Sequence, residues 1–406
     1  MNLRETDYYI QKVLEFSDPY NALKEKIRIK NNFIIAENRK FRAQKPLLIA
    51  VGKASFKMAK FFIERIKVRR SILIKPKGSP KVTLENTEII EAPHPIPDED
   101  SIRAAQIVLE TLRDEDYDLL LFLISGGASS MLELSNMTLE ELRDLYKKLI
   151  ESGISINEIN IVRKHVSEIK GGKLALKSKS PILTLAVSDV PGDEISSIGS
   201  GPTVPDLSSI EDARKILIRL NLQNYLKYLK ETPKYLNNSY YHIILNNFEV
   251  LKKLASLHKN SFILSSEISG DARSLGEFLA SIYNSTEIYG IPFKKPYLLL
   301  AGGEPEVKLL GKAGKGGRNG ETLLGFAKRK RVRGKFRFYA IATDGIDGNS
   351  EYAGGVIDEN FNVSVETIEE YLSNHSSYEL LERYNAVIKT GYTFTNVNNI
   401  YLLLVE

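Results

Sequence analysis

The strongest constraint on this chain is a set of short apolar runs, each followed by a loop of small residues and then by a helical pattern. Runs that are apolar at every position are typical of strands buried on both faces, as in parallel sheets covered by helices. Strands that alternate with amphipathic helices favour an α/β architecture. The runs are Pro46–Val51, Asp118–Ile124, Pro181–Val187, His242–Leu245, Ser261–Leu264, Pro296–Ala301 and Phe336–Ala342.

The length of the chain and one polar segment together predict two domains. With 406 residues, the chain is long enough for about two to three domains. Lys230–Ser239 contains Pro233 and an Asn-Asn pair, so we expect a linker there. The predicted domains are residues 1–232 and 240–406, and the final strand-like run, Ile400–Val405, can pair with either of them.

Local signals predict where several helices begin. Asp18-Pro19 can cap and start a helix, since proline suits the first turn. Thr138-Leu-Glu-Glu141 forms a capping box before an apolar-periodic run. Apolar periodicity also predicts helices over Ser208–Leu220 and Leu222–Leu229.

The composition excludes several classes of protein. A net charge of +5, from 56 basic and 51 acidic residues, is too small for a nucleic-acid binder. The absence of cysteine excludes disulfides, thiolate nucleophiles and cysteine metal sites. The charged N-terminus has no apolar signal region, and the most apolar run, Leu119–Ile124, is too short to span a bilayer. We therefore expect a cytoplasmic protein with no nucleic-acid or membrane partner.

Two glycine-containing loops are suited to anions. In LLIAVGKAS, Lys53 follows a strand end and precedes a helix start, where free N–H groups and the helix dipole favour negative charge. The alternative is a solvated lysine at a strand end. In LISGGASS, residues Ser125–Ser130 leave the backbone unobstructed, so successive N–H groups can form an anion-binding nest. The alternative there is an ordinary tight turn.

Two acidic loops also follow predicted strands. Asp189 and Asp193 lie in SDVPGDEISSIGSGPTVPD, where a carboxylate can accept a hydroxyl proton or bind Mg²⁺. Asp344 and Asp347 lie in ATDGIDG, whose spacing does not fit a calcium loop but allows Mg²⁺ bound with nucleotide phosphates. Solvated or turn-forming acids are the alternative in both loops.

A further strand leads to Gly302, Gly303 and Glu304, and a very glycine-rich loop then holds Arg318. Arginine offers a planar fork for phosphate oxygens and can stabilise transition-state charge. The alternative is a flexible surface loop. His94 and His165 are not chosen as catalysts, and the histidines show no metal-ligand spacing.

Taken in order along the chain, these motifs resemble the glycerate 2-kinase family, whose C-terminal part is known as the MOFRL domain. The resemblance covers nearly the whole chain. It rests on VGKAS (51–55), HPIPD (94–98), SGGASS (125–130), VRKHVSEIKGGKLA (162–175), SDVPGDEISSIGSGPTVPD (188–206), GGRNGE (316–321), ATDGIDG (342–348) and TNVNN (395–399).

The resemblance implies ATP-dependent, Mg²⁺-assisted phosphorylation of D-glycerate at its 2-hydroxyl, giving 2-phosphoglycerate. It also implies a Rossmann-like, three-layer αβα N-terminal domain, a smaller α/β C-terminal domain and a site in the cleft between them. Lys53 and Arg318 match the family's leading catalytic candidates, and Asp189 is expected to orient or deprotonate the hydroxyl. Asp344 and Asp193 are the expected metal ligands. The expected phosphate- or substrate-binding residues are Ser125, Gly126, Gly127, Ala128, Ser129, Gly302, Gly303, Glu304 and Asn396.

Two other functions compete with a kinase. The first is an NAD(P)H-dependent hydroxypyruvate reductase, which needs a nicotinamide site, but the chain contains no G-x-G-x-x-G fingerprint. The second is a non-catalytic sensor of an anionic metabolite, which could dispense with charges that this chain retains. A homodimer is expected from base rates alone.

Overall fold

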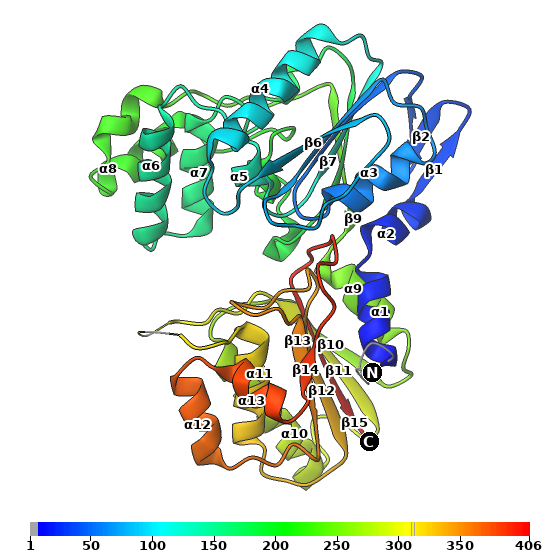
Figure 1. Cartoon of the computed structure of the whole chain (residues 1–406), viewed down its shortest axis with the longest axis vertical. Coiled ribbons are helices and arrows are strands. Elements are labelled where there is room, and N and C mark those ends of the chain that lie inside the picture. The colour runs from blue at the N-terminus through cyan, green and yellow to red at the C-terminus, as the bar shows by residue number, and fades with distance from the viewer. Residues whose placement is uncertain (1–6, 310, 312) are drawn as a thin grey trace. The chain divides into compact units, whose positions relative to one another are not determined.

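The computed structural model describes residues 7–309, 311 and 313–406, and its internal contacts divide the chain into two compact units (Figure 1). One unit is Pro19–Ile244. The other combines Leu245–Glu406 with the N-terminal part of the chain up to Asp18. The observed division therefore differs at two places from the predicted one, because the N-terminal segment clusters with the C-terminal unit and the boundary lies later than residue 232.

The unit Pro19–Ile244 is built on a six-stranded sheet in the order β6-β5-β4-β7-β8-β9. The pairs of β4 with β5 and β7, of β5 with β6 and of β7 with β8 are parallel. Every residue of β4, β7 and β8 is buried, so both faces of the sheet centre are covered, as the apolar runs predict. The strands are β4 (Pro46–Val51), β5 (Arg70–Pro76), β6 (Thr87–Ala92), β7 (Leu119–Ile124), β8 (Ile182–Val187) and β9 (Ser239–Leu245).

Helices and a small second sheet complete this unit. A separate apolar cluster joins α6, α7, α8 and the 3₁₀ helix η4, and it includes Leu145, Val162 and Leu217. The predicted capping box at Thr138 is present at the start of α6. The antiparallel sheet contains β1 (Ile27–Lys30), β2 (Phe33–Ala36) and β3 (Arg39–Arg42). The helices are α2 (Pro19–Lys26), α3 (Ser55–Ile63), α4 (Glu99–Asp114), α5 (Ala128–Met131), α6 (Leu139–Glu151), α7 (Ile156–Val166), η1 (Ala175–Lys177), η2 (Pro191–Asp193), η3 (Ile198–Ser200), α8 (Ile210–Arg219) and η4 (Gln223–Tyr228).

The other unit has a mixed six-stranded sheet in the order β10-β11-β15-β12-β13-β14. Only β10 and β11 form a parallel pair among its registered strands, and β15 runs antiparallel to both of its neighbours. The strands are β10 (Ser261–Ile268), β11 (Tyr297–Gly303), β12 (Phe336–Ala342), β13 (Gly354–Asp358), β14 (Val387–Ile388) and β15 (Asn399–Val405). The helices are α1 (Tyr8–Phe16), α9 (Asn247–Ala255), α10 (Ala272–Tyr289), α11 (Arg318–Arg329), α12 (Val365–Ser373) and α13 (Ser377–Arg383).

The predicted α/β class with two domains is confirmed, and each predicted apolar run falls on a strand, apart from a first residue, Asp118, Pro181 or Pro296, that precedes it. One strand joins a different sheet from the one expected. The run His242–Leu245 belongs to β9, the edge strand beside β8, and does not open the second sheet. Composition marks Lys230–Ser239 as irregular but contains no information about which sheet edge the next strand will join. None of the helices in the described part of the chain has the length and apolar character needed to cross a bilayer.

Candidate active site

Three loops of the unit Pro19–Ile244 lie at the same edge of its sheet because their strands end together. Val51 pairs with Ile124, and Ile124 pairs with Ala186. Ligands of open α/β sheets bind at such carboxyl edges. The loops containing Lys53, Ser125–Ser130 and Asp189 therefore share this edge.

Hydrogen bonds join the first two loops. The backbone N–H of Lys53 donates to the carbonyl oxygen of Gly126 over 2.9 Å, and the N–H of Ala54 donates to Ser125 Oγ over 2.9 Å. Gly52, with φ of +114°, permits this approach, since a Cβ there would lie 2.4 Å from Ser125 Oγ and 2.6 Å from the Ser125 oxygen. The lysine is thus held at the start of the glycine-rich Ser125–Ser130 loop.

A third glycine-rich segment, Gly199–Gly201, closes on the same loop. Ser129 Oγ lies 2.9 Å from Ser200 Oγ. Gly127 has φ of +84°, and Ala128 begins the short helix α5 directly after it. The predicted binding residues Ser125, Gly126, Gly127, Ala128 and Ser129 therefore form one continuous turn that contacts Ser200.

His94 also belongs to this group, although sequence reasoning did not select it. Its Nδ1 lies 3.4 Å from Ser130 Oγ, and its ring lies within 4 Å of the position that a Cβ on Gly127 would occupy. The side chain is exposed. The motif HPIPD marks His94 in the sequence. The position of this motif along the chain does not predict that His94 contacts the Ser125–Ser130 loop.

Asp189 and Asp193 both lie in the loop that follows β8. Both are half-buried. Burial, followed by the charges of Asp189 and Asp193, raises the pKa of the Tyr241 hydroxyl on β9. Asp193 has φ of +55°, and its N–H donates to the Val190 oxygen over 3.0 Å. This turn directly follows Asp189, so both aspartates lie in the chain just after the end of β8.

In the C-terminal unit, the predicted residues Gly303, Glu304 and Arg318 are brought together at one end of the sheet. Asn399 pairs with Gly303 on one side and with Ala342 on the other. Arg318 opens helix α11, and its Nη1 lies 2.7 Å from Glu304 Oε1. The guanidinium is therefore held at a helix N-terminus, where the dipole favours an anion.

The TNVNN motif forms the frame of this end. Asn319 Nδ2 donates to Asn399 Oδ1 over 2.9 Å, and Asn399 Nδ2 donates to the Gly303 oxygen over 3.0 Å. A Cβ on Gly302 would lie 1.9 Å from Asn247 Oδ1, so this glycine permits close packing of the frame. Asn396 is largely buried, and its Oδ1 accepts a bond from the Asn398 N–H over 3.2 Å. Its observed contact thus shapes the loop.

The two aspartates of ATDGIDG have different environments. Asp344 is half-buried, and its Oδ1 accepts a bond from the Ile346 N–H over 3.2 Å. Asp347 is only 1% exposed, and its Oδ2 accepts bonds from the N–H groups of Asn319 (2.9 Å) and Gly320 (3.2 Å) and from the Tyr378 hydroxyl (2.6 Å). Burial raises the pKa of Asp347 to about 6. Asp347 therefore anchors the first turn of α11.

A cavity of about 320 Å³ lies beside Arg318. Its walls include Glu321, Asn349, His375 and the glycine backbone between residues 314 and 317. Glu321 pairs with Arg273 over 2.7 Å and with His375 Nδ1 over 2.8 Å. A concave surface with glycine walls and a cation at a helix N-terminus is suited to a ligand that contains phosphate.

Within the described residues, no three His, Cys, Asp or Glu side chains gather closely enough to hold a metal ion by themselves. The expected ligands Asp193 and Asp344 each offer one carboxylate. Mg²⁺ bound to nucleotide needs only one or two protein carboxylates, since phosphates and waters complete its shell. The side chains present are compatible with that kind of binding.

Comparison with known proteins identifies the family. A glycerate 2-kinase of Sulfurisphaera tokodaii is 56% identical over 399 residues, which cover 98% of this chain and 99% of the relative. The chain belongs to the glycerate 2-kinase family. The solved structure of a glycerate kinase from Thermotoga maritima has a TM-score of 0.86 at 35% identity, over 98% of this chain and 97% of that one.

Two domain models match different parts of this glycerate 2-kinase family member. A domain of unknown function, DUF4147, matches residues 6–231, and the MOFRL family matches residues 297–399. Another relative, from Agrobacterium vitis, bears the name putative hydroxypyruvate reductase and is 36% identical over 340 residues, covering 78% of this chain and 77% of its own length.

Proposed function

We propose that this protein transfers the γ-phosphoryl group of ATP to the 2-hydroxyl of D-glycerate, giving 2-phosphoglycerate and ADP. The observation that supports this most directly is that each unit holds a cation beside a glycine-rich turn. Lys53 precedes the Ser125–Ser130 loop in one unit, and Arg318 opens α11 in the other. The names of the most similar relatives agree with this chemistry.

Phosphoryl transfer depends mainly on positioning and on neutralising charge. In the proposed reaction, the glycerate 2-oxygen forms a bond to the γ-phosphorus, and the bond from that phosphorus to the β–γ bridging oxygen breaks. Asp189 orients the 2-hydroxyl and accepts its proton. Lys53 and Arg318 hold oxygens of the transferring group and of the substrate carboxylate, and the Ser125–Ser129 turn binds an anionic group.

Mg²⁺, when bound with ATP, would neutralise charge on the phosphates. Asp344 and Asp193 are the carboxylates that we propose as its protein ligands. Because Lys53 and Arg318 belong to different units, the proposal requires both units to act on one set of substrates, as the implied interdomain cleft would allow. The cytoplasmic location and the homodimer stay predictions.

The first test is the activity of Lys53→Ala and Arg318→Ala with ATP, Mg²⁺ and D-glycerate. Loss of a cation from the transition state is expected to lower kcat by roughly 100-fold or more in each variant. Lys60→Ala and Arg329→Ala are matched controls on the exposed parts of α3 and α11, and their kcat is expected to stay near the wild-type value. Near wild-type kcat in both test variants would show that the roles are wrong. NMR of the product identifies the phosphorylated carbon.

The name of the Agrobacterium vitis relative favours one competing function, the reduction of hydroxypyruvate. That reaction consumes NADH or NADPH and can be followed by the loss of absorbance of the reduced cofactor. We expect no loss with hydroxypyruvate under conditions that support phosphorylation of glycerate. Reductase turnover without kinase turnover would replace the proposal.

A further inference from the structure

The motif VRKHVSEIKGGKLA contains three lysines that are buried in the structure. Lys164, Lys170 and Lys173 are 4%, 0% and 7% exposed. Burying an ammonium group is costly unless it is paired or hydrogen-bonded, so each of these side chains needs partners that offset the cost of its burial. Their partners differ, and two of the three lysines hold loops of the candidate site.

Lys170 holds the end of the Ser125–Ser130 loop. Its Nζ lies 2.6 Å from Glu133 Oε2, and both side chains are fully buried. The same ammonium donates to the Leu132 oxygen over 3.1 Å. Leu132 and Glu133 directly follow α5, so this ion pair fixes the exit of the glycine-rich turn.

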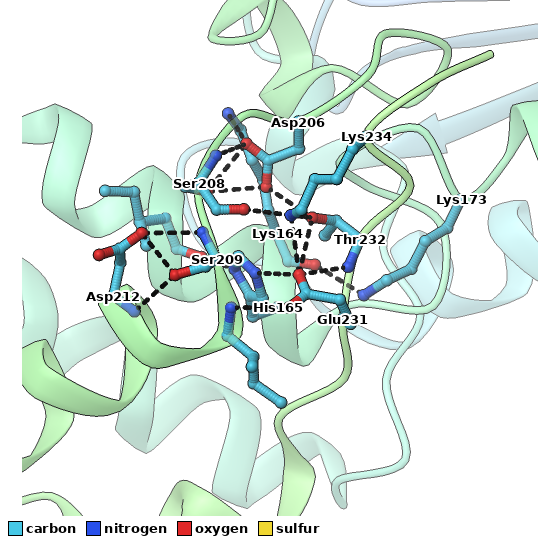
Figure 2. A network of polar contacts seen from close by, with 12 residues as sticks. Lys164, His165, Lys173, Asp206, Ser208, Ser209, Asp212, Glu231, Thr232 and Lys234 are labelled. Atoms are coloured by element: carbon cyan, nitrogen blue, oxygen red, sulfur yellow. Dashed lines mark hydrogen bonds and ion pairs between the residues drawn. The ribbon is translucent and has the colours of Figure 1, made fainter.

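Lys164 holds the acidic loop that contains Asp189 and Asp193. Its Nζ donates to Ser196 Oγ over 3.1 Å and to Asp206 Oδ1 over 3.2 Å. Figure 2 shows the network around Asp206, which also accepts bonds from Ser208 and from Thr232 Oγ1 (3.0 Å).

Ser196 and Asp206 lie on either side of Gly199–Gly201. One turn earlier on α7, Asn160 Oδ1 accepts a bond from Ser200 Oγ over 3.3 Å. The same face of the helix therefore contacts the loop before, within and after its glycine-rich part.

The backbone after α7 adds to this anchoring. The N–H of Gly171 donates to the Ser200 oxygen over 3.0 Å, and the N–H of Gly172 donates to the Gly201 oxygen over 2.7 Å. Ser200 has φ of +60°, a conformation that non-glycine residues keep only when their surroundings impose it. The imposed turn brings Ser200 Oγ to 2.9 Å from Ser129 Oγ, which couples the two loops.

We propose that Asn160 and Lys164 on α7, together with the backbone of Gly171 and Gly172, position the acidic loop for the reaction, and that Lys164 is the positioning residue of this set. The Lys164 ammonium fixes Ser196 and Asp206, so that Ser200 meets Ser129 and the Asp189 carboxylate stays at the end of β8. Lys164 acts through these partners and does not itself contact the reacting atoms. The inference rests on the kinase function proposed above.

Lys173 provides a matched control. Its ammonium donates to the carbonyl oxygens of Lys164 (2.8 Å) and Ser167 (2.6 Å), which belong to the same segment. Lys164→Met removes a buried ammonium from α7, and Lys173→Met removes one from the segment that follows this helix, and both changes keep most of the aliphatic stem. Only the second change removes a bond to the acidic loop.

The experiment compares kcat, the KM for ATP and the melting temperature of both variants with those of the wild type. For Lys164→Met we expect kcat to fall roughly 10- to 100-fold, since misplacing catalytic groups by about 1 Å can have an effect of that size. The KM for ATP is expected to change less than about three-fold, because Lys53, Arg318 and Asp344, which are proposed to bind the phosphates and their metal ion, lie outside this loop. The melting temperature is expected to fall no further than in Lys173→Met, which keeps kcat within about three-fold of the wild type.

Equal losses of kcat in Lys164→Met and Lys173→Met would overturn the inference, because both would then report a structural effect. Should Lys164→Met fail to fold, Ser196→Ala removes one bond to the same ammonium, and an unchanged kcat in that variant would equally overturn it. A wild-type protein that is inactive with ATP and glycerate would instead refute the proposed function.

Discussion

At the scale of single residues, Asp344 and Asp347 have nearly the same local sequence but different environments. Both follow the same strand and precede a glycine. The structure leaves Asp344 half-buried, whereas Asp347 is enclosed beneath α11 and bonded to its first N–H groups. Burial disfavours a charged carboxylate, and the helix N-terminus only partly offsets that penalty. Asp347 is therefore a structural anchor whose ionisation opposes folding.

The substitution Asp347→Asn is expected to change the pH dependence of stability. The native carboxyl keeps its proton up to about pH 6, whereas the unfolded one loses it near its usual value of 3.8. The native state thus binds more protons in this range, and stability falls as the pH rises from about 4 to 6. This rise in the pKa of Asp347 corresponds to a loss of roughly 3 kcal/mol in the free energy of unfolding, and Asp347→Asn should abolish that loss. Chemical denaturation across this pH range measures the difference, and parallel curves for the two proteins would contradict it.

At the scale of elements, the last strand has a larger role than its terminal position suggests. β15 is paired along its whole length with β11 on one side and with β12 on the other. All of its residues except Leu404 are buried. The C-terminal unit therefore depends on the final residues of the chain to join its two other central strands.

Ending the chain after Asn398 is expected to unfold this unit. Each large apolar residue of β15 contributes about 2 kcal/mol by burial, so losing the strand removes as much free energy as a typical domain has in total. Hydrogen exchange should show loss of protection throughout residues 245–398, while the sheet of Pro19–Ile244 keeps its protection. Removal of Glu406 alone, which is exposed, is the control and should have little effect. Persistent protection of β11 and β12 in the truncated chain would contradict this role.

At the scale of the whole molecule, the C-terminal unit is formed by two segments that are far apart in the chain, the N-terminal part up to Asp18 and Leu245–Glu406. Helix α1 contacts α9, with Ile10 and Val13 buried. The Tyr339 hydroxyl donates to Asp7 Oδ2 over 3.0 Å, and Thr395 Oγ1 donates to the Ser17 oxygen over 2.7 Å. These contacts explain why the N-terminal segment belongs to the same unit as residues 245–406.

A chain that begins at Pro19 is therefore expected to have a less stable C-terminal unit. The stability of the unit Pro19–Ile244 is expected to stay the same. Loss of Ile10 and Val13 from the apolar interior is expected to lower the free energy of unfolding by roughly 3–5 kcal/mol. Hydrogen exchange should quicken in α9 and β12. Glu15→Ala, an exposed position on α1, is the control. Faster exchange confined to Pro19–Ile244 would contradict the assignment.

The most apolar strands, several helix starts and most of the loops with candidate site residues could be predicted from the sequence, because each depends on local pattern. An apolar run such as Leu119–Ile124 must be buried wherever it lies, and the Thr138 capping box satisfies its own helix. The strands β5, β6, β13 and β14 and those of the small β1–β3 sheet were not predicted. They are short, or charged, polar or glycine residues interrupt their apolar pattern, so their local signal is weak.

What the sequence by itself determined is the α/β class, the family and the set of loops that bear Lys53, Arg318 and the paired aspartates, since motif order and apolar periodicity are properties of the linear chain. Only the tertiary structure decided that β9 closes the first sheet, that α1 packs with the C-terminal unit and that β15 lies between β11 and β12. It also buried Asp347 but not Asp344, and it determined the hydrogen-bond and ion-pair partners of the buried lysines between residues 164 and 173. The physical reason is that strand order and burial arise from contacts between residues far apart in the chain, and no local pattern encodes those partners.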